Sequence, residues 1–253
     1  MLLILRSIVN IWVNEMGTTE DRIKSIRKAE AASHTEAYTN YELFSTGSWL
    51  SKPVKTVLDL FPYFRNYQEL RVLDLGSGVG RNAIPIAKHF KGTPCHIDCV
   101  DILELAIDKL EDNARKHDVD NSIYGIVQPI DCFSIEEESY DLILAISALE
   151  HIDSKDSFVK KLFEIRNGLH SNGIVCLILN SGVEEHVKST GETLIPQFEV
   201  NIPTEEMINT LREVFSEWKI LKQTVVHQIY DIPRDIGISH VDTDVVTYVV
   251  QKP

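Results

Sequence analysis

The sequence predicts a doubly wound α/β fold built on a mostly parallel sheet of seven strands, with an antiparallel C-terminal strand. Three observations indicate this. Short apolar runs alternate along the chain with segments whose apolar residues recur at helical spacing. Residues 173–179 form a continuous apolar run, which is typical of a parallel strand buried on both faces. Beyond residue 217, two strand-like runs follow each other without a full helix between them, which favours an antiparallel pair.

The same patterns place the elements of the α/β part in chain order. The predicted strands lie at residues 71–75, 95–100, 123–127, 140–146, 173–179, 218–230 and 241–250. The predicted helices lie at residues 81–89, 103–114, 158–169 and 204–215. Pro85 is expected to tighten or kink the opening turn of the first of these helices. Thr204 is a candidate N-cap for the last one.

The region before the first strand is expected to form a helical cap. Residues 20–41 are rich in charge and contain neither Gly nor Pro. Pro53 favours a short helix at residues 53–61, because proline fits the first turn of a helix. We therefore expect an N-terminal extension at 1–16, a cap or lid at 17–66 and an α/β domain at 67–253.

The N-terminal extension opens with an apolar run at residues 1–13, interrupted by Arg6, Ser7 and Asn10. The run is too short to span a bilayer. It has no basic segment before it and no small-residue cleavage site after it, so a signal peptide is not expected either. Two alternatives stay open: Met16 is the natural start, or the run is an amphipathic packing helix. A chain that begins at Met16 is expected to fold and to bind its ligand.

Composition and charge narrow the possible partners. The chain has 25 Lys and Arg against 38 Asp and Glu, for a formal net charge of -13. Such a surface repels phosphate backbones, so a broad nucleic-acid interface is not expected. The four cysteines, Cys95, Cys99, Cys132 and Cys176, include no CxxC pair, and His186, His227 and His240 have no metal-ligand spacing. We expect buried, reduced thiols, no metal and a soluble cytoplasmic protein.

The informative segment is a glycine-rich turn between the first strand and its helix. Residues 72–82 read VLDLGSGVGRN, with glycines at 76, 78 and 80. Glycine permits positive φ and lets a ligand approach the backbone without meeting a Cβ. At this place in an α/β sheet, a ligand lies across the strand ends and faces the helix N-terminus. The alternative is a tight strand-to-helix turn without a ligand.

An acidic residue after the second strand favours the ligand. Asp101 follows Gly80 by 21 residues, where a carboxylate accepts hydrogen bonds from both ribose hydroxyls of an adenosine ligand. It is also a candidate N-cap for the helix that follows, and the two roles are compatible. In the dinucleotide fingerprint G-x-G-x-x-G, the third glycine would stand where this chain has Arg81, which disfavours NAD and FAD. Asp74 adds a carboxylate that suits the cationic amino acid end of S-adenosylmethionine.

These motifs together resemble the class I S-adenosylmethionine-dependent methyltransferases. VLDLGSGVGRNA is similar to motif I of that family, and VDILELAIDKLEDNA to its ribose-binding acidic motif and helix. IDCFSI, YDLILAISALEHI and LHSNGIVCLILN resemble the motifs around the third, fourth and fifth strands. The resemblance covers residues 71–180, and the GRNA variant is similar to the tellurite-resistance-type, small-molecule branch.

The resemblance implies a Rossmann-like fold, S-adenosyl-L-methionine as cofactor and S-adenosyl-L-homocysteine as product. It implies that Asp74 and the turn of Gly76, Ser77, Gly78 and Gly80 lie near the methionine moiety. Asp101 and Ile102 would hold the ribose, Asp131 and Cys132 the adenine, and Ser147 would line the cofactor after the fourth strand.

The acceptor side is predicted from position alone. A base is needed only if the acceptor keeps its proton, and Glu150 and His151, just after the fourth strand, are the catalytic candidates. Asn180 and Ser181 follow the fifth strand and are candidate acceptor contacts. Tyr38 and Tyr41 are candidate lid residues, because each joins an apolar ring to a polar tip, although core packing would also use such residues.

We expect a small-molecule acceptor first, a protein side chain second and RNA third. Two other functions stay open: a catalytically silent S-adenosylmethionine-binding partner or sensor, and, less favoured by the glycine spacing, an NAD-dependent oxidoreductase.

Overall fold

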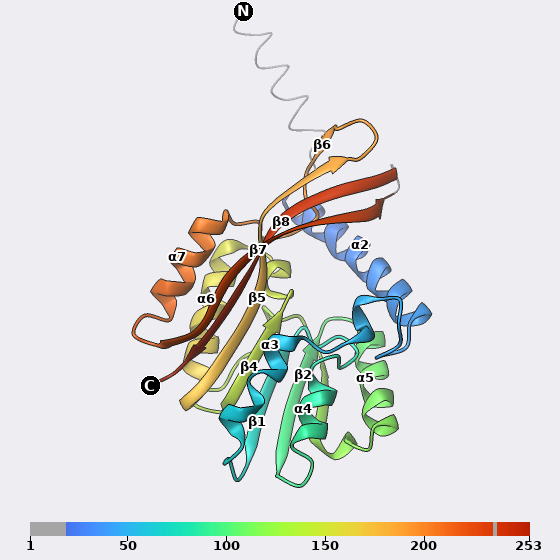
Figure 1. The fold of residues 1–253 in the computed structure, drawn as a ribbon. Coiled ribbons are helices and arrows are strands. Elements are labelled where there is room, and N and C mark those ends of the chain that lie inside the picture. The colour runs from blue at the N-terminus through green and yellow to red at the C-terminus, as the bar shows by residue number, and fades with distance from the viewer. Residues whose placement is uncertain (1–18, 235–236) are drawn as a thin grey trace, which may run out of the picture.

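A computed structural model describes residues 19–234 and 237–253. The central sheet has the strand order β3-β2-β1-β4-β5-β8-β7, with β6 pairing only with β5 (Figure 1). The first five strands of that order are parallel, and β8 is antiparallel to both of its neighbours. The predicted mostly parallel sheet with antiparallel C-terminal strands is therefore confirmed.

The strands are β1 (Leu70–Leu75), β2 (Cys95–Asp101), β3 (Ile123–Val127), β4 (Tyr140–Ile146), β5 (Leu169–Val187), β6 (Thr193–Leu194), β7 (Lys219–Arg234) and β8 (Gly237–Gln251). The α-helices are α2 (Thr19–Asn40), α3 (Lys55–Leu58), α4 (Ala83–His89), α5 (Glu104–Lys116), α6 (Lys155–Gly168) and α7 (Thr204–Val214). Short 3₁₀ helices are η1 (Trp49–Ser51), η2 (Phe61–Phe64), η3 (Asp120–Ser122) and η4 (Leu149–His151).

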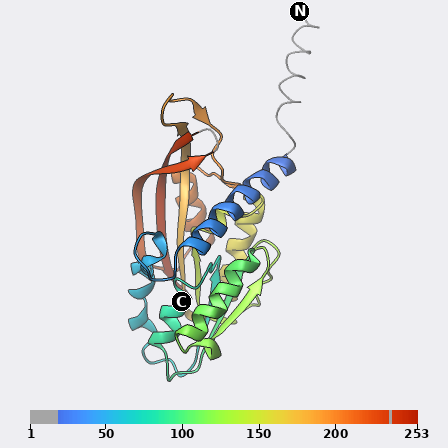
Figure 2. The same ribbon diagram turned by 90° about the vertical axis from the view of Figure 1, so that its right-hand side faces the viewer.

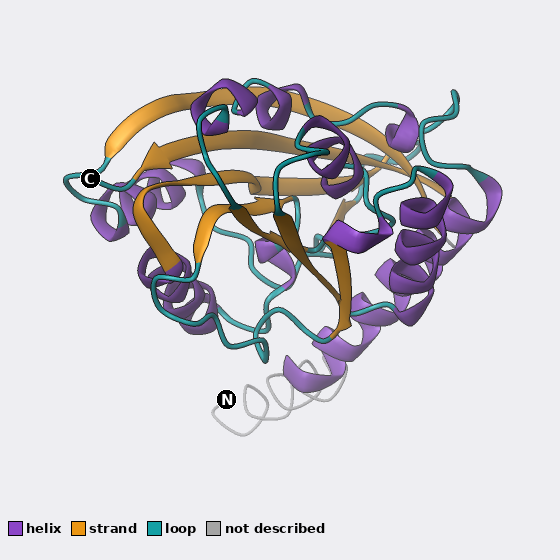
Figure 3. Ribbon diagram, turned by 90° about the horizontal axis from the view of Figure 1, so that it is seen from below, coloured by secondary structure: helices purple, strands orange, loops and turns teal. Residues whose placement is uncertain are grey.

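Helices cover both faces of the sheet, as Figure 3 shows. One core cluster joins the apolar sides of α6 and α7 to the sheet through residues such as Phe158 and Leu211. A second joins α3, α4 and α5 to the opposite face through residues such as Val57, Ile86 and Leu110. The central strands β1 and β4 are buried on both sides as a result, which explains their continuous apolar runs, whereas β3 lies at the edge of the sheet and is partly exposed.

Three strands run well past the helical layers. β5, β7 and β8 contain 19, 16 and 15 residues, longer than the runs that predicted them. Their added length forms an antiparallel extension beyond the carboxyl ends of the parallel strands (Figure 1). Helix α2 lies on the same side of the molecule and reaches α5, as the turned view in Figure 2 shows. The space between α2 and the strand ends holds the candidate site.

Several local expectations are corrected. The predicted helix at 53–61 is two short pieces, α3 and η2. Thr204 is the first residue of α7 and not its N-cap, which is Pro203. The Thr204 hydroxyl donates to Asp244 at 2.9 Å. All four thiols are free, as expected, but Cys132 is exposed and Cys95 is only partly buried.

None of the described helices is long and apolar enough to cross a membrane. The expectations for residues 1–16 and for a start at Met16 lie outside the described residues.

Candidate functional site

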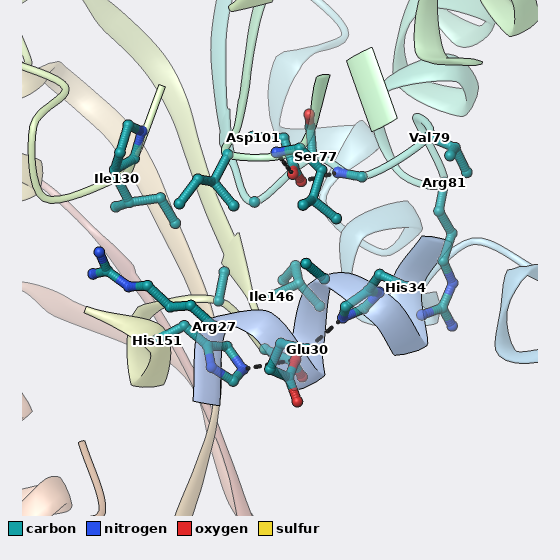
Figure 4. Close-up of a pocket in the computed structure, with 18 of the residues that line it drawn as sticks. Arg27, Glu30, His34, Ser77, Val79, Arg81, Asp101, Ile130, Ile146 and His151 are labelled. Carbon is teal, nitrogen blue, oxygen red and sulfur yellow. Dashed lines mark hydrogen bonds and ion pairs between the residues drawn. The ribbon is translucent and has the colours of Figure 1, made fainter. Parts of the chain in front are cut away.

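A cavity of about 540 Å³ lies at the carboxyl ends of the parallel strands, beneath α2 (Figure 4). Its walls include the residues that follow β1, β2, β3 and β4. The strand order reverses between β1 and β4, and the crevice at such a switch point is the usual ligand site of an open α/β sheet. The position of the cavity therefore follows from the topology.

The glycine turn forms one wall of this cavity. Gly76 and Gly78 have φ values of 73° and 52°, which side-chain-bearing residues rarely adopt. A Cβ on Gly76 would stand 2.4 Å from the Cβ of Ala148, and one on Gly78 would stand 2.8 Å from the hydroxyl of Tyr38. Gly80 differs, because its Cβ would meet Leu110 at 2.6 Å. Gly80 thus permits helix packing and does not line the cavity.

Asp101 fastens the turn to the second strand. One carboxylate oxygen accepts the N–H of Gly78 and the other accepts the N–H of Leu103, both at 2.9 Å. Burial raises the pKa of this carboxyl, although the two backbone hydrogen bonds oppose the rise. Asp101 was a candidate N-cap for α5, but the N-cap residue is Leu103. Asp101 instead accepts the N–H of that residue. The carboxylate also lines the cavity, as does its neighbour Ile102.

Two buried polar atoms near the turn have no hydrogen-bond partner among the described residues. They are Oδ2 of Asp74 and Oγ of Ser77. Burial, together with the negative charge of Asp101, raises the pKa of Asp74 to about 7. Buried polar atoms are normally satisfied, so a ligand group that bonds to these atoms would be favoured here. Ser77 lines the cavity, whereas Asp74 lies behind the turn and does not line it.

The loop after β3 supplies another wall. Asp131 lines the cavity together with Pro129 and Ile130, and one of its carboxylate oxygens lies 3.5 Å from the guanidinium of Arg27. Cys132 does not line the cavity and is exposed. After β4, Ser147 lines the cavity in a left-handed conformation with φ 50°.

Helix α2 closes the cavity with one face. Arg27, Glu30, Ala31, His34 and Tyr38 line it, at spacings of three and four residues that place them on one side of a helix. Tyr38 is buried and lies against the glycine turn, whereas Tyr41 is 41% exposed and does not line the cavity.

The helix is tied across the cavity. The guanidinium of Arg22 donates to the carbonyl of Phe198 at 2.7 Å. The guanidinium of Arg27 lies 3.6 Å from Oε1 of Glu199.

His151 ends η4, just after β4, and lies between two carboxylates. Its Nδ1 lies 2.9 Å from Oε2 of Glu199. Its Nε2 lies 3.7 Å from Oε2 of Glu30, the pair that Figure 4 shows. Burial alone would lower the pKa of His151. The hydrogen bond to Glu199 and the nearby carboxylates outweigh it and raise the pKa to about 9. The ring also stacks on Phe198, with centroids 5.6 Å apart.

Of the other residues predicted on the acceptor side, one lines the cavity and two do not. Asn180 lines the cavity. Glu150 is fully buried, does not line the cavity, and accepts from the side-chain amide of Asn180 at 2.6 Å. Ser181 is also fully buried and donates to the carbonyl of Asp244 at 3.0 Å. Glu150 therefore orients Asn180, while Ser181 packs between strands.

Residues 72–173 match the family described as a methyltransferase domain. The match contains the glycine turn, Asp101, Asp131 and His151.

The chain therefore carries a methyltransferase domain with the class I, S-adenosylmethionine-dependent fold.

Solved structures share the fold of this methyltransferase. TehB from Haemophilus influenzae is 17% identical with a TM-score of 0.56, and the alignment covers 79% of this chain and 62% of TehB. The 1,6-didemethyltoxoflavin N1-methyltransferase of Burkholderia thailandensis is 14% identical with a TM-score of 0.57, over 94% and 91% of the two chains. The [4+2]-cyclase SpnF is 12% identical with a TM-score of 0.55, over 85% of each. Identities this low show the fold alone. No curated protein matches the sequence.

The site of the methyltransferase fits its cofactor. The unpaired oxygens of Asp74 and Ser77 match an ammonium group, and a Cβ at Gly76 or Gly78 would meet the close walls of the turn. Asp101 presents a carboxylate to the same space. Among the described residues, no group of three or more His, Cys, Asp or Glu could hold a metal ion.

Sequence reasoning missed a second set of residues that line the cavity of the methyltransferase. They are Arg27, Glu30, His34, Arg81, Phe198, Glu199 and Tyr230. The spacing of the α2 members was a signal within residues 20–41. No comparable signal marked Glu199, which lies 48 residues beyond His151, or Tyr230, which the long strand β7 carries to the cavity.

Proposed function

We propose that this methyltransferase methylates a small molecule held between α2 and the carboxyl ends of β4 and β5. The proposal rests on one observation, which is that α2 covers the cavity. Arg22 and Arg27 of α2 bind the segment at residues 198–199 on the other side of it. A covered cavity favours a ligand that fits wholly inside it over a folded protein or an RNA. The net charge of -13 further disfavours RNA. The Burkholderia neighbour also acts on a small molecule.

The cofactor end would be formed by the glycine turn and by the residues after β2, β3 and β4. The residues proposed to hold the cofactor are Asp74, Gly76, Ser77, Gly78, Asp101, Ile102, Asp131 and Ser147. Gly80 and Cys132 are left out because neither lines the cavity. Asp74 does not line it either, but it is kept because its buried carboxyl oxygen beside the turn has no partner among the described residues. We also propose that residues 17–66 act as a cap on the domain at 67–253, since α2 supplies one wall.

The chemistry requires orientation above all. The cofactor supplies a methyl group on a sulfonium, which is already a good leaving group. The protein must hold the acceptor in line with that bond, and such alignment contributes roughly 7–11 kcal/mol in favourable cases. Ile146, Asn180, Phe198 and Tyr230 line the part of the cavity where an acceptor would lie. They combine apolar area with few polar groups, which is typical of small-molecule sites.

Two measurements test the proposal. Calorimetry should show binding of S-adenosylmethionine and S-adenosylhomocysteine but no comparable binding of NAD. The protein is then incubated with methyl-labelled S-adenosylmethionine and with separate small-molecule, protein and RNA fractions of a cell extract. Label should pass to the small-molecule fraction.

The second measurement is required because the fold also occurs in a cyclase, so cofactor binding alone does not show transfer. The Asp101→Asn protein is the control for cofactor-dependent label. A preference for NAD, label in the protein or RNA fraction, or binding without transfer to any fraction would each overturn the proposal.

A further inference from the structure

His151 is held by two carboxylates from different parts of the chain. It ends η4, after β4, and lines the cavity. Glu199 contacts its Nδ1 from the segment between β6 and α7, and Glu30 faces its Nε2 from α2. The side chain of Glu199 is only 1% exposed, so its contact with the ring is poorly screened by water.

All charged groups around the ring bear on its protonation. The carboxylates are Glu30, Glu150 and Glu199, and all three favour the imidazolium. Burial opposes them but does not outweigh them, so the pKa rises to about 9. At neutral pH both ring nitrogens therefore carry a proton, and the ring has no free lone pair with which to accept another.

Cations also face this cluster, and they bear on the carboxylates. The Arg27 guanidinium lies 3.6 Å from Glu199 and 3.5 Å from Asp131. Arg234 acts on Glu30 from β7, and the His34 ring, on the same helix as Glu30, lies 3.4 Å from that carboxylate as a polar neighbour. A buried carboxylate is costly unless cations pair with it. Glu199 has such partners on both sides, and Glu30 is shared between His34 and His151.

One donor of His151 is left available to a ligand. The Nε2–H faces Glu30 at 3.7 Å, which is beyond a hydrogen bond, whereas Nδ1–H is bound to Glu199 at 2.9 Å. Because His151 lines the cavity, a ligand oxygen can accept this proton where Glu30 does not reach it.

We propose that Glu199 and Glu30 hold His151 as a charged hydrogen-bond donor to the methyl acceptor, and that the acceptor is an acidic small molecule that reacts as its anion. Phenols, enols and thiols are the chemical classes meant. The inference rests on the proposed methyl transfer. In the reaction, a lone pair of the anion forms the bond to the methyl carbon while the carbon–sulfur bond breaks and leaves its electron pair on sulfur. No proton is released, so His151 is not needed as a base.

The first test measures the protonation of His151 itself. The ring is followed by NMR through a pH titration of the protein, free and with S-adenosylhomocysteine bound, and is assigned with the His151→Asn protein. In the wild type the ring should stay protonated to about pH 9. Glu199→Gln should lower its pKa by about one unit or more, because a buried hydrogen-bonded charge is lost. Glu30→Gln should lower it less.

Glu192→Gln is the matched control, since Glu192 lies in the same part of the chain, is exposed, and makes only backbone hydrogen bonds among those described. It should leave the titration unchanged. The inference is overturned if His151 of the wild type titrates near its ordinary value, or if neither Glu variant moves it. Should Glu199→Gln fail to fold, Glu30→Gln decides the outcome.

The second test uses 4-nitrophenol as a probe, because its anion absorbs visible light and it titrates near neutrality. With S-adenosylhomocysteine bound, the wild type should bind the probe as phenolate and shift its titration to lower pH. His151→Asn should abolish the shift. Binding as the neutral phenol, an equal shift in His151→Asn, or no binding would each contradict the inference. Absence of S-adenosylhomocysteine binding would instead contradict the proposed function, and the NMR titration of the free protein would still be readable.

Discussion

Asp101 supports the glycine turn and is also predicted to bind the ribose, so a useful variant must affect binding more than folding. Its oxygens hold the N–H groups of Gly78 and Leu103, so Asp101→Ala removes two supports of the turn as well as the predicted ribose contact. Asp101→Asn keeps one carbonyl acceptor and the size of the side chain. Loss of charge-assisted bonds to a ligand costs roughly 1.5–3 kcal/mol, or about tenfold to a hundredfold in affinity.

We expect that loss for S-adenosylhomocysteine in Asp101→Asn, measured by calorimetry, together with a fall in thermal stability, because the amide nitrogen leaves the N–H of Gly78 or Leu103 without its acceptor. Asp108→Ala removes an exposed acid from the neighbouring helix α5 and should change neither. Wild-type affinity in a folded Asp101→Asn protein would show that the carboxylate does not contact the cofactor.

Gly78 is predicted to be irreplaceable for two separable reasons. In Gly78→Ala the new Cβ meets the Tyr38 hydroxyl at 2.8 Å, and the φ of 52° adds strain of about 1–3 kcal/mol. In the double variant Gly78→Ala/Tyr38→Phe the nearest atom becomes Cζ of residue 38 at 3.6 Å, an ordinary contact. Thermal stability should therefore recover in part, while S-adenosylhomocysteine binding stays weak because the Cβ still enters the cavity wall.

Gly92→Ala provides the comparison, because Gly92 has φ 106° and nothing within 4 Å of an added Cβ. It should lose stability through backbone strain alone and bind the cofactor normally. Equal affinity for S-adenosylhomocysteine in Gly78→Ala and Gly92→Ala would argue against the turn as the cofactor cradle.

At the level of elements, the positions of strands and helices were easier to predict than the side chains that they contribute to the cavity. The bounds of β3 and β4 were predicted to the residue, because each is a mostly apolar run with a polar residue directly before and after it. The length of β5, β7 and β8 was not, because their distal halves mix polar and apolar residues on exposed faces.

Helix α2 was likewise placed within one residue of each end, yet its cavity-facing side was not recognised. Charged residues such as Arg27 and Glu30 look like a solvated helix face in sequence. Only the tertiary position of Glu199 and His151 shows that they are partners.

Helix α2 should open and close over the cavity, with Arg22 as its tether. The Arg22 guanidinium bond to the Phe198 carbonyl is 2.7 Å long, and a bond of this kind contributes at least about 1.5 kcal/mol, or roughly tenfold in a local opening equilibrium. Hydrogen exchange of the α2 amides should therefore be about tenfold faster in Arg22→Ala, and S-adenosylhomocysteine should slow it in the wild type. Lys24→Ala, which removes only an exposed pair with Glu20, should match the wild type. Identical exchange in Arg22→Ala and Lys24→Ala would rule out the tether.

For the whole molecule, charge links the site to stability. The net charge is -13, and repulsion between negative charges in the folded protein grows as pH rises and more groups lose their protons. Two groups at the site, Asp74 and His151, keep their protons in the folded state at pH values where the unfolded chain has released them. Asp74, with a pKa of about 7 against 3.8, keeps its proton in the folded state between those values, so its burial destabilises the fold progressively as pH rises from 3.8 to 7. His151 acts over the next interval.

The stability of the free protein should therefore fall from pH 6.5 to 9, and His151 should account for much of the slope. Its pKa of about 9 in the folded state exceeds the ordinary 6.5, so its stabilising contribution is complete below pH 6.5 and is lost as pH rises through 9. One unit of pKa shift corresponds to about 1.4 kcal/mol, which sets the expected loss at roughly 1–3 kcal/mol over this interval. Denaturant unfolding at several pH values should show a steeper decline in the wild type than in His151→Asn, since the variant has no proton to lose there.

His227→Asn, which removes an exposed histidine from β7, should keep the wild-type slope. Parallel curves for the wild type and His151→Asn would mean that the carboxylates of Glu30 and Glu199 do not hold the ring as a cation, and the acceptor would then need no negative charge to bind beside it.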